Sequence, residues 1–336
     1  MERCPKFIRS LRKNFMSKEL YPFLFKPVYK NYIWGGSSIS EEYKRNISDN
    51  SCAESWEISD RSDGMSIIEN GYYKNQTLKS LINSKGKLIL GSKAKGNSFP
   101  LLIKIIDAKK KLSLQVHPNN KSSKKYGGEA KTELWYILKS KNASIYHGFN
   151  DKMSKSDFKD ALKKNILDEK IKRLSVSKND SILVEGGCIH AIGEGCLILE
   201  IQQNSNTTYR IHDWNRDKSY NRELHIEEAI NVINWNKKFK SKIKPRILSK
   251  NNEYLIEEIG YSSFFKVERL QLISLINVRM DETSFHAIFV TDGNIRIKWN
   301  KTNELLIPIG RSCLIPSSIQ SYDIIGKGSV IRTFLP

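Results

Sequence analysis

The feature that most constrains this chain is a short stretch, residues 112–118, in which polar and apolar side chains alternate. Alternation with a period of two is typical of a β-strand, because successive side chains point to opposite faces. Ser113, Gln115 and His117 would therefore project from one face, and Pro118, which lacks an N–H for the ladder, would end the strand. The stretch predicts a strand that presents a hydroxyl, an amide and an imidazole in a row.

Two later segments carry side chains of the same chemical kind. Glu133 opens the apolar run 134–138, and residues 180–193 follow the pattern of a strand, a glycine turn and a second strand bearing His190. Amide, imidazole and carboxylate groups that converge from neighbouring strands supply the oxygen and nitrogen donors that zinc accepts. The expected ligands of one metal ion are Gln115, His117, Glu133 and His190.

Length and cysteine content narrow the class of protein. The chain has 336 residues, enough for one large domain or two, and it contains no apolar run near the roughly 20 residues of a membrane span. Its five cysteines include no Cys-x-x-Cys pair, which argues against a disulfide framework and against a cysteine-ligated zinc. We expect a cytoplasmic protein without membrane partners, in which Cys188 is a small buried thiol rather than a ligand.

The net charge of +20 raises the question of an acidic partner. The lysines are scattered among loops and helix faces, without a basic stripe that alternates with aromatic residues and without a recognition-helix pattern. We therefore expect a solvated, lysine-rich surface and no nucleic-acid binding.

The remaining sequence predicts many short strands and a few helices. Strands are expected at residues 52–58, 65–69, 101–106, 171–176, 181–184, 196–202 and 207–212. Helices are expected within residues 77–82, 151–167 and 226–235. The pair Asp292–Gly293 between alternating segments predicts a β-hairpin over residues 288–297. The pattern favours a mainly β barrel or jelly roll.

Lys104 stands out because it is the one charge in the apolar run 101–106. Burial would penalise it unless it has a partner or lines a cavity. The alternative is a surface-facing position at a sheet edge.

Four motifs, in this order, resemble the type I mannose-6-phosphate isomerases, particularly the short bacterial form. They are Leu-Ser-x-Gln-x-His-Pro at 112–118, Lys-Thr-Glu-Leu-Trp at 131–135, His-Ala-Ile-Gly at 190–193 and Glu-Ile-Gln-Gln-x-Ser-x-Thr-Thr-Tyr-Arg at 200–210. The stretches 32–36, 53–58 and 100–104 agree as well. The resemblance is strong over residues 20–235 and weak beyond them.

The resemblance implies a metal-dependent isomerase that interconverts mannose 6-phosphate and fructose 6-phosphate through a cis-enediol(ate). It implies one zinc ion per chain, although nitrogen and oxygen donors also admit manganese, cobalt or iron. It further implies a cupin fold (double-stranded β-helix or jelly roll) with two cupin-like β-barrels and small helical insertions.

The same resemblance suggests roles for individual residues. Arg210 would be catalytic, stabilising developing negative charge and contacting the substrate. Lys131 would be catalytic and substrate-binding, and Ser113 would contact the substrate. An ion pair with Glu200 or Asp213 is the alternative for Arg210, and a solvated loop position is the alternative for Lys131. The group that abstracts the proton stays open among metal-bound hydroxide, Glu200 and Lys131.

The expected domains follow from these motifs and from a basic linker near residue 240. Residues 1–19 are expected to be a disordered N-terminal extension, and residues 20–240 the catalytic metal-binding cupin domain. Residues 246–336 are expected to be a degenerate cupin domain, because the turn at 310–316 lacks a histidine.

Two other classes of function remain open. One is a cupin oxygenase that holds iron, and the other is a sugar-binding cupin without turnover. The expected partner is a sugar phosphate, and the expected assembly is a monomer or a weak homodimer.

Overall fold

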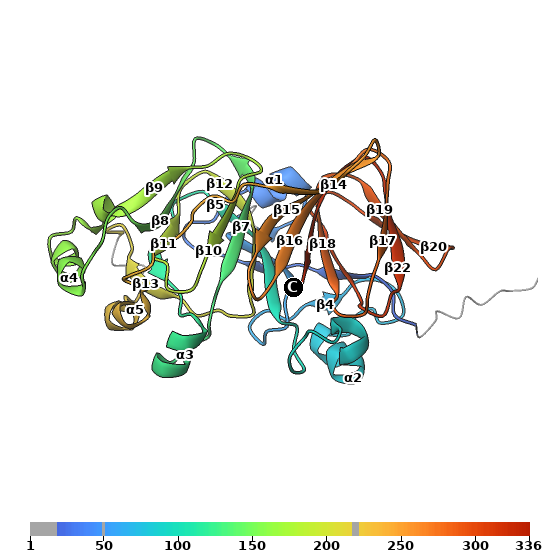
Figure 1. The fold of residues 1–336 in the computed structure, drawn as a ribbon, viewed down its shortest axis with the longest axis horizontal. Helices are drawn as coiled ribbons and strands as arrows, with labels where there is room; N and C mark the ends of the chain where they lie inside the picture. Colours follow the sequence, from blue (N-terminus) through green and yellow to red (C-terminus); the bar gives the residue numbers. More distant parts are fainter. Residues whose placement is uncertain (1–18, 49–50, 217–221) are drawn as a thin grey trace, which may run out of the picture.

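The computed structural model describes residues 19–48, 51–216 and 222–336. Almost all of the predicted N-terminal extension therefore lies outside the described residues. The described chain is mainly antiparallel β-structure, as the short alternating segments predicted, and its strands form four sheets (Figure 1).

Two of these sheets carry the predicted site residues. The six-stranded sheet has the order β10-β7-β12-β5-β3-β2, and the five-stranded sheet has the order β13-β6-β11-β8-β9. The first contains β2 (Val28–Lys30), β3 (Glu54–Ile58), β5 (Leu101–Ala108), β7 (Glu133–Ser140), β10 (Ser181–Val184) and β12 (Cys196–Gln203). The second contains β6 (Leu114–Val116), β8 (Ser144–Phe149), β9 (Ile171–Ser175), β11 (His190–Ile192) and β13 (Tyr209–His212).

The other two sheets are built mostly from the C-terminal part of the chain, drawn in orange and red in Figure 1. The eight-stranded sheet has the order β14-β15-β16-β23-β18-β21-β1-β4, and the four-stranded sheet has the order β17-β22-β19-β20. The eight strands are β1 (Phe23–Lys26), β4 (Ile67–Ile68), β14 (Arg246–Lys250), β15 (Tyr254–Tyr261), β16 (Lys266–Leu272), β18 (His286–Gly293), β21 (Ser312–Ile315) and β23 (Gly328–Phe334). The four strands are β17 (Leu275–Arg279), β19 (Ile295–Trp299), β20 (Asn303–Ile307) and β22 (Ser321–Ile325).

Short helices connect the strands. They are α1 (Ser38–Tyr43), α2 (Leu78–Leu90), α3 (Asn120–Tyr126), α4 (Lys155–Lys163) and α5 (Ile226–Val232), with a 3-10 turn at Leu167–Lys170. The α4 helix begins after Ser154, whose side chain accepts a hydrogen bond from the backbone N–H of Asp157, and it buries Phe158 and Ala161. Within the described residues, no helix is both long and apolar enough to cross a membrane.

The helix predicted at 77–82 is longer than expected. It starts after Thr77, as predicted, but continues to Leu90 because Ile89 and Leu90 are buried together with its first turns. Its backbone is irregular at Lys85.

The hairpin predicted at Asp292–Gly293 is wrong. β18 pairs with β21 and β23, whereas β19 pairs with β20 and β22. Gly293 lies opposite Gly328, so the chain passes from one sheet to the other at this point instead of folding back. An Asp-Gly pair supplies the local freedom for a tight turn, but the pairing partners of the two strands decide whether a hairpin forms.

The N-terminal strand joins the C-terminal strands. Phe23 of β1 lies opposite Leu314 of β21, and the core around them contains Phe265 and Ile331 as well as Leu134 of β7. The part of the chain before residue 240 and the C-terminal part therefore share a sheet and a core.

Candidate active site

The predicted site residues of the five-stranded sheet lie in one row. Arg210 of β13 lies opposite Gln115 of β6, and Gln115 lies opposite His190 of β11. Residues directly opposite each other in antiparallel strands project from the same face. The alternation in residues 112–118 thus presents Gln115 and His117 to the site, as predicted.

His117, Glu133 and His190 form a compact buried cluster. Their ligand atoms lie within 4.8 Å of one another, and none of the three residues is more than 1% exposed. Nε2 of His117 lies 3.6 Å from Oε2 of Glu133, and Nε2 of His190 lies 3.4 Å from Oε1. Two strands of one sheet and one strand of the other therefore bring the three donors to a single point.

Backbone contacts fix which ring nitrogen of each histidine carries the proton. Nδ1 of His117 donates to the carbonyl of Thr207 at 2.8 Å, and Nδ1 of His190 donates to the carbonyl of Cys188 at 2.8 Å. Because a carbonyl only accepts, the Nε2 atoms that face Glu133 carry lone pairs.

Both histidines are neutral. Burial lowers the pKa of His117 well below 6.5, and burial lowers the pKa of His190 to about 3. The contacts with Glu133 are therefore not ion pairs. A neutral imidazole is the form that binds a metal ion.

The cluster has the polar atoms that a cation would satisfy. Nε2 of His117 and both carboxylate oxygens of Glu133 are buried and have no partner in hydrogen-bond geometry among the described residues, although the Lys131 ammonium lies 3.0 Å from Oε2 of Glu133. Burial first, and then the charge of Glu200, raises the pKa of Glu133 to about 7. Unsatisfied buried polar atoms are costly, so the donor set fits a divalent ion.

Gln115 lies beside this cluster. Its Nε2 is 3.4 Å from Nε2 of His190, and its Oε1 is 3.5 Å from Oγ of Ser113. The amide N–H therefore faces the lone pair of His190. A half-turn of the amide would exchange the two atoms and present the oxygen, the donor that a metal ion accepts.

A buried row of alternating charges, called the charge chain below, lies along the six-stranded sheet. Its members are, in order, Glu54, Lys104, Glu200, Lys131 and Glu133. Lys104 lies 3.3 Å from Oε2 of Glu54 and 3.0 Å from Oε1 of Glu200. Lys131 lies 3.8 Å from Oε1 of Glu200 and 3.0 Å from Oε2 of Glu133. The attraction of both lysines outweighs burial and lowers the pKa of Glu200. Lys104 therefore occupies the buried, partnered position, and Lys131 is not a solvated loop residue.

Two tryptophans orient the carboxylates of this chain. Nε1 of Trp56 donates to Oε2 of Glu54 at 2.7 Å, and Nε1 of Trp135 donates to Oε2 of Glu200 at 2.9 Å. The sequence analysis did not single out Glu54, although the stretch 53–58 that contains it carries part of the resemblance.

A cavity of about 370 Å³ opens next to these charges. Its lining includes Ser113, Gln115, Lys131 and Arg210, four of the predicted site residues. The other lining residues are Tyr32, Trp34, Glu54, Lys104, Ile106, Leu112, Ile192, Glu200, Asn206, Thr208 and Arg222. Arg222 was not predicted from the sequence, because it lies in no motif.

Arg210 forms no ion pair with Glu200 or Asp213 among the described residues. Its Nη1 donates to the backbone carbonyl of Glu223 at 2.7 Å, and its buried Nε has no hydrogen-bond partner in the part of the chain that the structure describes. The guanidinium group therefore keeps donor capacity for a ligand in the cavity.

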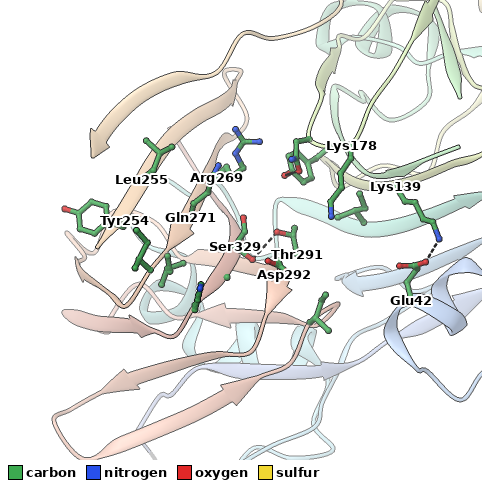
Figure 2. A pocket seen from close by; sticks show the side chains of 18 of the residues that line it. Glu42, Lys139, Lys178, Tyr254, Leu255, Arg269, Gln271, Thr291, Asp292 and Ser329 are labelled. Atoms are coloured by element: carbon green, nitrogen blue, oxygen red, sulfur yellow. Dashed lines mark hydrogen bonds and ion pairs between the residues drawn. The ribbon is translucent and has the colours of Figure 1, made fainter. Parts of the chain in front are cut away.

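A larger cavity, of about 540 Å³, lies elsewhere. It is lined by residues such as Lys139 and Lys178 on one side and Tyr254 and Arg269 on the other (Figure 2), and by none of the predicted site residues. Size alone does not identify the site, since the smaller cavity is the one lined by Lys131 and Gln115, which lie directly beside the donor cluster.

Comparisons with known proteins agree with this site. The family model of the phosphomannose isomerase type I catalytic domain matches residues 23–154. A mannose-6-phosphate isomerase of Streptococcus mutans is 33% identical over 316 residues, which are 93% of this chain and 97% of that protein. Mannose-6-phosphate isomerase ManA of Bacillus subtilis is 39% identical over 217 residues, which are 63% of this chain and 68% of that protein.

Solved structures show the same fold. The mannose 6-phosphate isomerase of Bacillus subtilis superimposes with a TM-score of 0.85 at 28% identity, over 93% of this chain and 99% of that chain. A putative mannosephosphate isomerase of Archaeoglobus fulgidus reaches a TM-score of 0.77 at 20% identity, over 94% and 97% of the two chains, and this likeness concerns the fold alone. The mainly β cupin fold predicted from the sequence is confirmed. This chain belongs to the type I mannose-6-phosphate isomerase family, whose enzymes interconvert mannose 6-phosphate and fructose 6-phosphate.

Proposed function

We propose that this chain isomerises mannose 6-phosphate and fructose 6-phosphate at one divalent metal ion, and that this ion is zinc. The observation that carries the proposal is the buried cluster of two neutral imidazoles and an unsatisfied carboxylate. This cluster lies beside a cavity whose lining includes four positively charged side chains, those of Lys104, Lys131, Arg210 and Arg222. The proposed ligands are Gln115, His117, Glu133 and His190.

The reaction moves a proton between C1 and C2 of the sugar while the carbonyl and hydroxyl groups exchange positions. A bound divalent ion supplies Lewis-acid stabilisation of the charge that develops on the sugar oxygens. Arg210 offers a permanently charged group with free donor capacity to the same region, and Ser113 offers a hydroxyl. Both are proposed to contact the substrate.

Two residues of the charge chain can carry the proton. Glu200 is held as a carboxylate by Lys104 and Lys131, which is the form that accepts a proton. Lys131 lies between Glu200 and Glu133 and lines the cavity. We propose Lys131 as a catalytic and substrate-binding residue, with Glu200 as its neighbour in proton transfer.

Two further proposals concern the setting of the enzyme. A cytoplasmic location is supported by the four cysteines within the described residues, which are all free and buried. The division into a catalytic part at 20–240 and a metal-free part at 246–336 is supported by the placement of every proposed ligand before residue 240.

A coupled assay of mannose 6-phosphate conversion tests the function. We expect activity with the metal-loaded protein, loss of activity after chelation, and recovery on adding zinc.

His117→Ala should remain folded but lose stoichiometric metal, whereas His212→Ala, outside the cluster, should keep it. Full activity after complete metal removal, or stoichiometric metal in folded His117→Ala, would contradict the proposal. Oxygen consumption without isomerisation would favour the oxygenase alternative.

A further inference from the structure

Three arginines gather near a single carboxylate at one end of the active-site cavity. Nη1 of Arg216 lies 2.6 Å from Oδ1 of Asp213, and Nη1 of Arg222 lies 2.9 Å from the same oxygen. Arg210 lies close enough that its charge, after burial, lowers the pKa of Arg222, and the charge of Arg216 does the same. Within the described residues, these guanidinium groups therefore surround one partly buried acid, Asp213, whose side chain is 15% exposed, whereas the Glu223 side chain nearby is 84% exposed.

Only two of these arginines line the cavity. Arg210 and Arg222 do so, whereas Arg216 turns away and donates to the backbone carbonyl of Lys111. Among the described residues, the buried Nε of Arg210 has no hydrogen-bond partner, and the side-chain bond from Arg222 to Asp213 engages a single nitrogen of its five-donor fork. Both groups therefore have donors available to a ligand in the cavity.

The two ends of the cavity carry opposite charge excesses. At the metal-binding end, the carboxylates of Glu54, Glu133 and Glu200 face the ammonium groups of Lys104 and Lys131, which leaves an excess of one negative charge. At the arginine end, Arg216 and Arg222 pair with Asp213 and Arg210 lies nearby, which leaves an excess of two positive charges. A divalent cation complements the first end, and a dianion complements the second.

We propose that Arg222 binds the phosphate group of the substrate and sets the preference for phosphorylated sugars, with Asp213 as the positioning residue that orients its guanidinium group. The inference rests on the proposed function, because it places C1 and C2 of the sugar at the metal-binding end. A phosphate monoester carries about two negative charges, and an arginine fork matches its oxygens in pairs. Tyr32 lines the same cavity as Glu54 and Arg222.

The test compares Arg222→Gln with wild type in three measurements on metal-loaded protein. The KM for mannose 6-phosphate should rise roughly 10- to 100-fold, because charge-assisted hydrogen bonds to the phosphate are lost, and kcat should change less than KM. The inhibition constant of inorganic phosphate should rise by a similar factor. Turnover of unphosphorylated mannose should stay unchanged. Arg222→Lys should recover part of the phosphate affinity, since it restores the charge without the fork.

Arg246→Gln is the matched control, because it removes the same charge from an arginine that pairs with Glu258 and does not line the cavity. It should leave all three measurements unchanged. A KM and a phosphate inhibition constant within twofold of wild type in Arg222→Gln would overturn the inference. An equal loss of mannose turnover would overturn it as well, because Arg222 would then act in catalysis or folding.

Failure of the proposed function gives a different result. If metal-loaded wild type does not isomerise mannose 6-phosphate, calorimetric titration with inorganic phosphate still reports on Arg222. Binding to wild type but not to Arg222→Gln supports the phosphate site, and equal binding to both overturns it.

Discussion

Lys104 shows, at the scale of a single residue, that the neighbouring side chains determine whether a buried charge is tolerated. It is 4% exposed in a strand of apolar side chains, and it is retained there because Glu54 and Glu200 lie within ion-pair distance on either side. Its attraction to Glu200 and Glu54 outweighs burial and raises its pKa. Removing Lys104 would leave the carboxylates of Glu54 and Glu200 without the charge that lies between them, which is far more costly than the loss of an exposed ion pair.

Arg210→Ala should keep its metal and its fold but lose activity. The group is expected to stabilise charge in the transition state, and removal of such a donor typically lowers kcat by about 10²–10³-fold. The measurements are kcat, KM and metal content on one purified sample, with Arg210→Lys as the variant that retains charge without the fork. A near-normal kcat with a raised KM would assign Arg210 to phosphate binding alone, the pattern expected instead for Arg222.

His286 should make folding sensitive to mild acid. Burial lowers its pKa well below 6.5, and its Nδ1 lies 2.7 Å from the hydroxyl of Tyr322. Below pH 6.5 the unfolded chain takes up a proton at this position that the folded chain does not, so the free energy of unfolding falls as pH decreases. Urea unfolding at pH 7.5, 6.5 and 5.5 should show a shallower decline for His286→Gln than for wild type. Identical declines in both proteins would show that His286 does not contribute.

At the scale of secondary-structure elements, the turn between β10 and β11 packs against the strand end that carries His117 of the proposed metal site. The N–H of Gly187 donates to the carbonyl of His117 at 2.7 Å, and Gly187 adopts a φ of +92°. A Cβ on Gly186 would lie 2.7 Å from the carbonyl oxygen of Pro118 and from Cα of Asn119. The glycines thus allow the turn to pack directly against the end of the strand that carries His117.

Gly186→Ala should therefore lower metal affinity as well as stability. The new methyl group would press on the backbone next to His117, and small displacements of ligands weaken a metal site. The measurement is metal content after dialysis against a weak chelator, together with urea unfolding. Gly86→Ala in α2 is the control, since its Cβ would meet only a side-chain atom of Ile82 at 3.5 Å. This control should keep its metal; if Gly186→Ala does so too, the turn is not critical.

At the scale of the whole molecule, the two parts of the chain fold around common structure. β1 and β4 extend the sheet of the C-terminal strands, and one hydrophobic cluster contains Phe25 and Leu134 as well as Phe265 and Ile331. Close packing across this region leaves no room for a side chain at Gly260, where a Cβ would lie 1.9 Å from Cδ1 of Leu134.

Intact protein should therefore unfold in one cooperative transition, and residues 19–240 expressed alone should not fold cooperatively. The fragment would lose the strand partner of β1 and expose the apolar side chains that face the C-terminal sheet. Circular dichroism and fluorescence during urea unfolding test this expectation. A fragment that unfolds cooperatively and retains full activity would show that the C-terminal part is dispensable.

Much of the candidate site could be predicted because, in a β-strand, the spacing of residues along the sequence determines the face to which their side chains point. The period of two at Ser113, Gln115 and His117 determines that their side chains share a face, wherever that strand lies. The glycine turn before His190 and the polar start of the run at Glu133 are likewise local features. The sequence by itself therefore determined the mainly β class, the donor types and the family motifs.

Other properties depend on which strands become neighbours, and only the tertiary structure decided them. The strand pairing placed Lys104 beside Glu200, separated β18 from β19 despite the Asp-Gly turn signal, and joined β1 to the C-terminal sheet. Arg222 lines the cavity although no motif marks it. The physical reason is that side-chain direction is a local consequence of backbone geometry, whereas charge compensation and burial depend on contacts between residues distant in sequence.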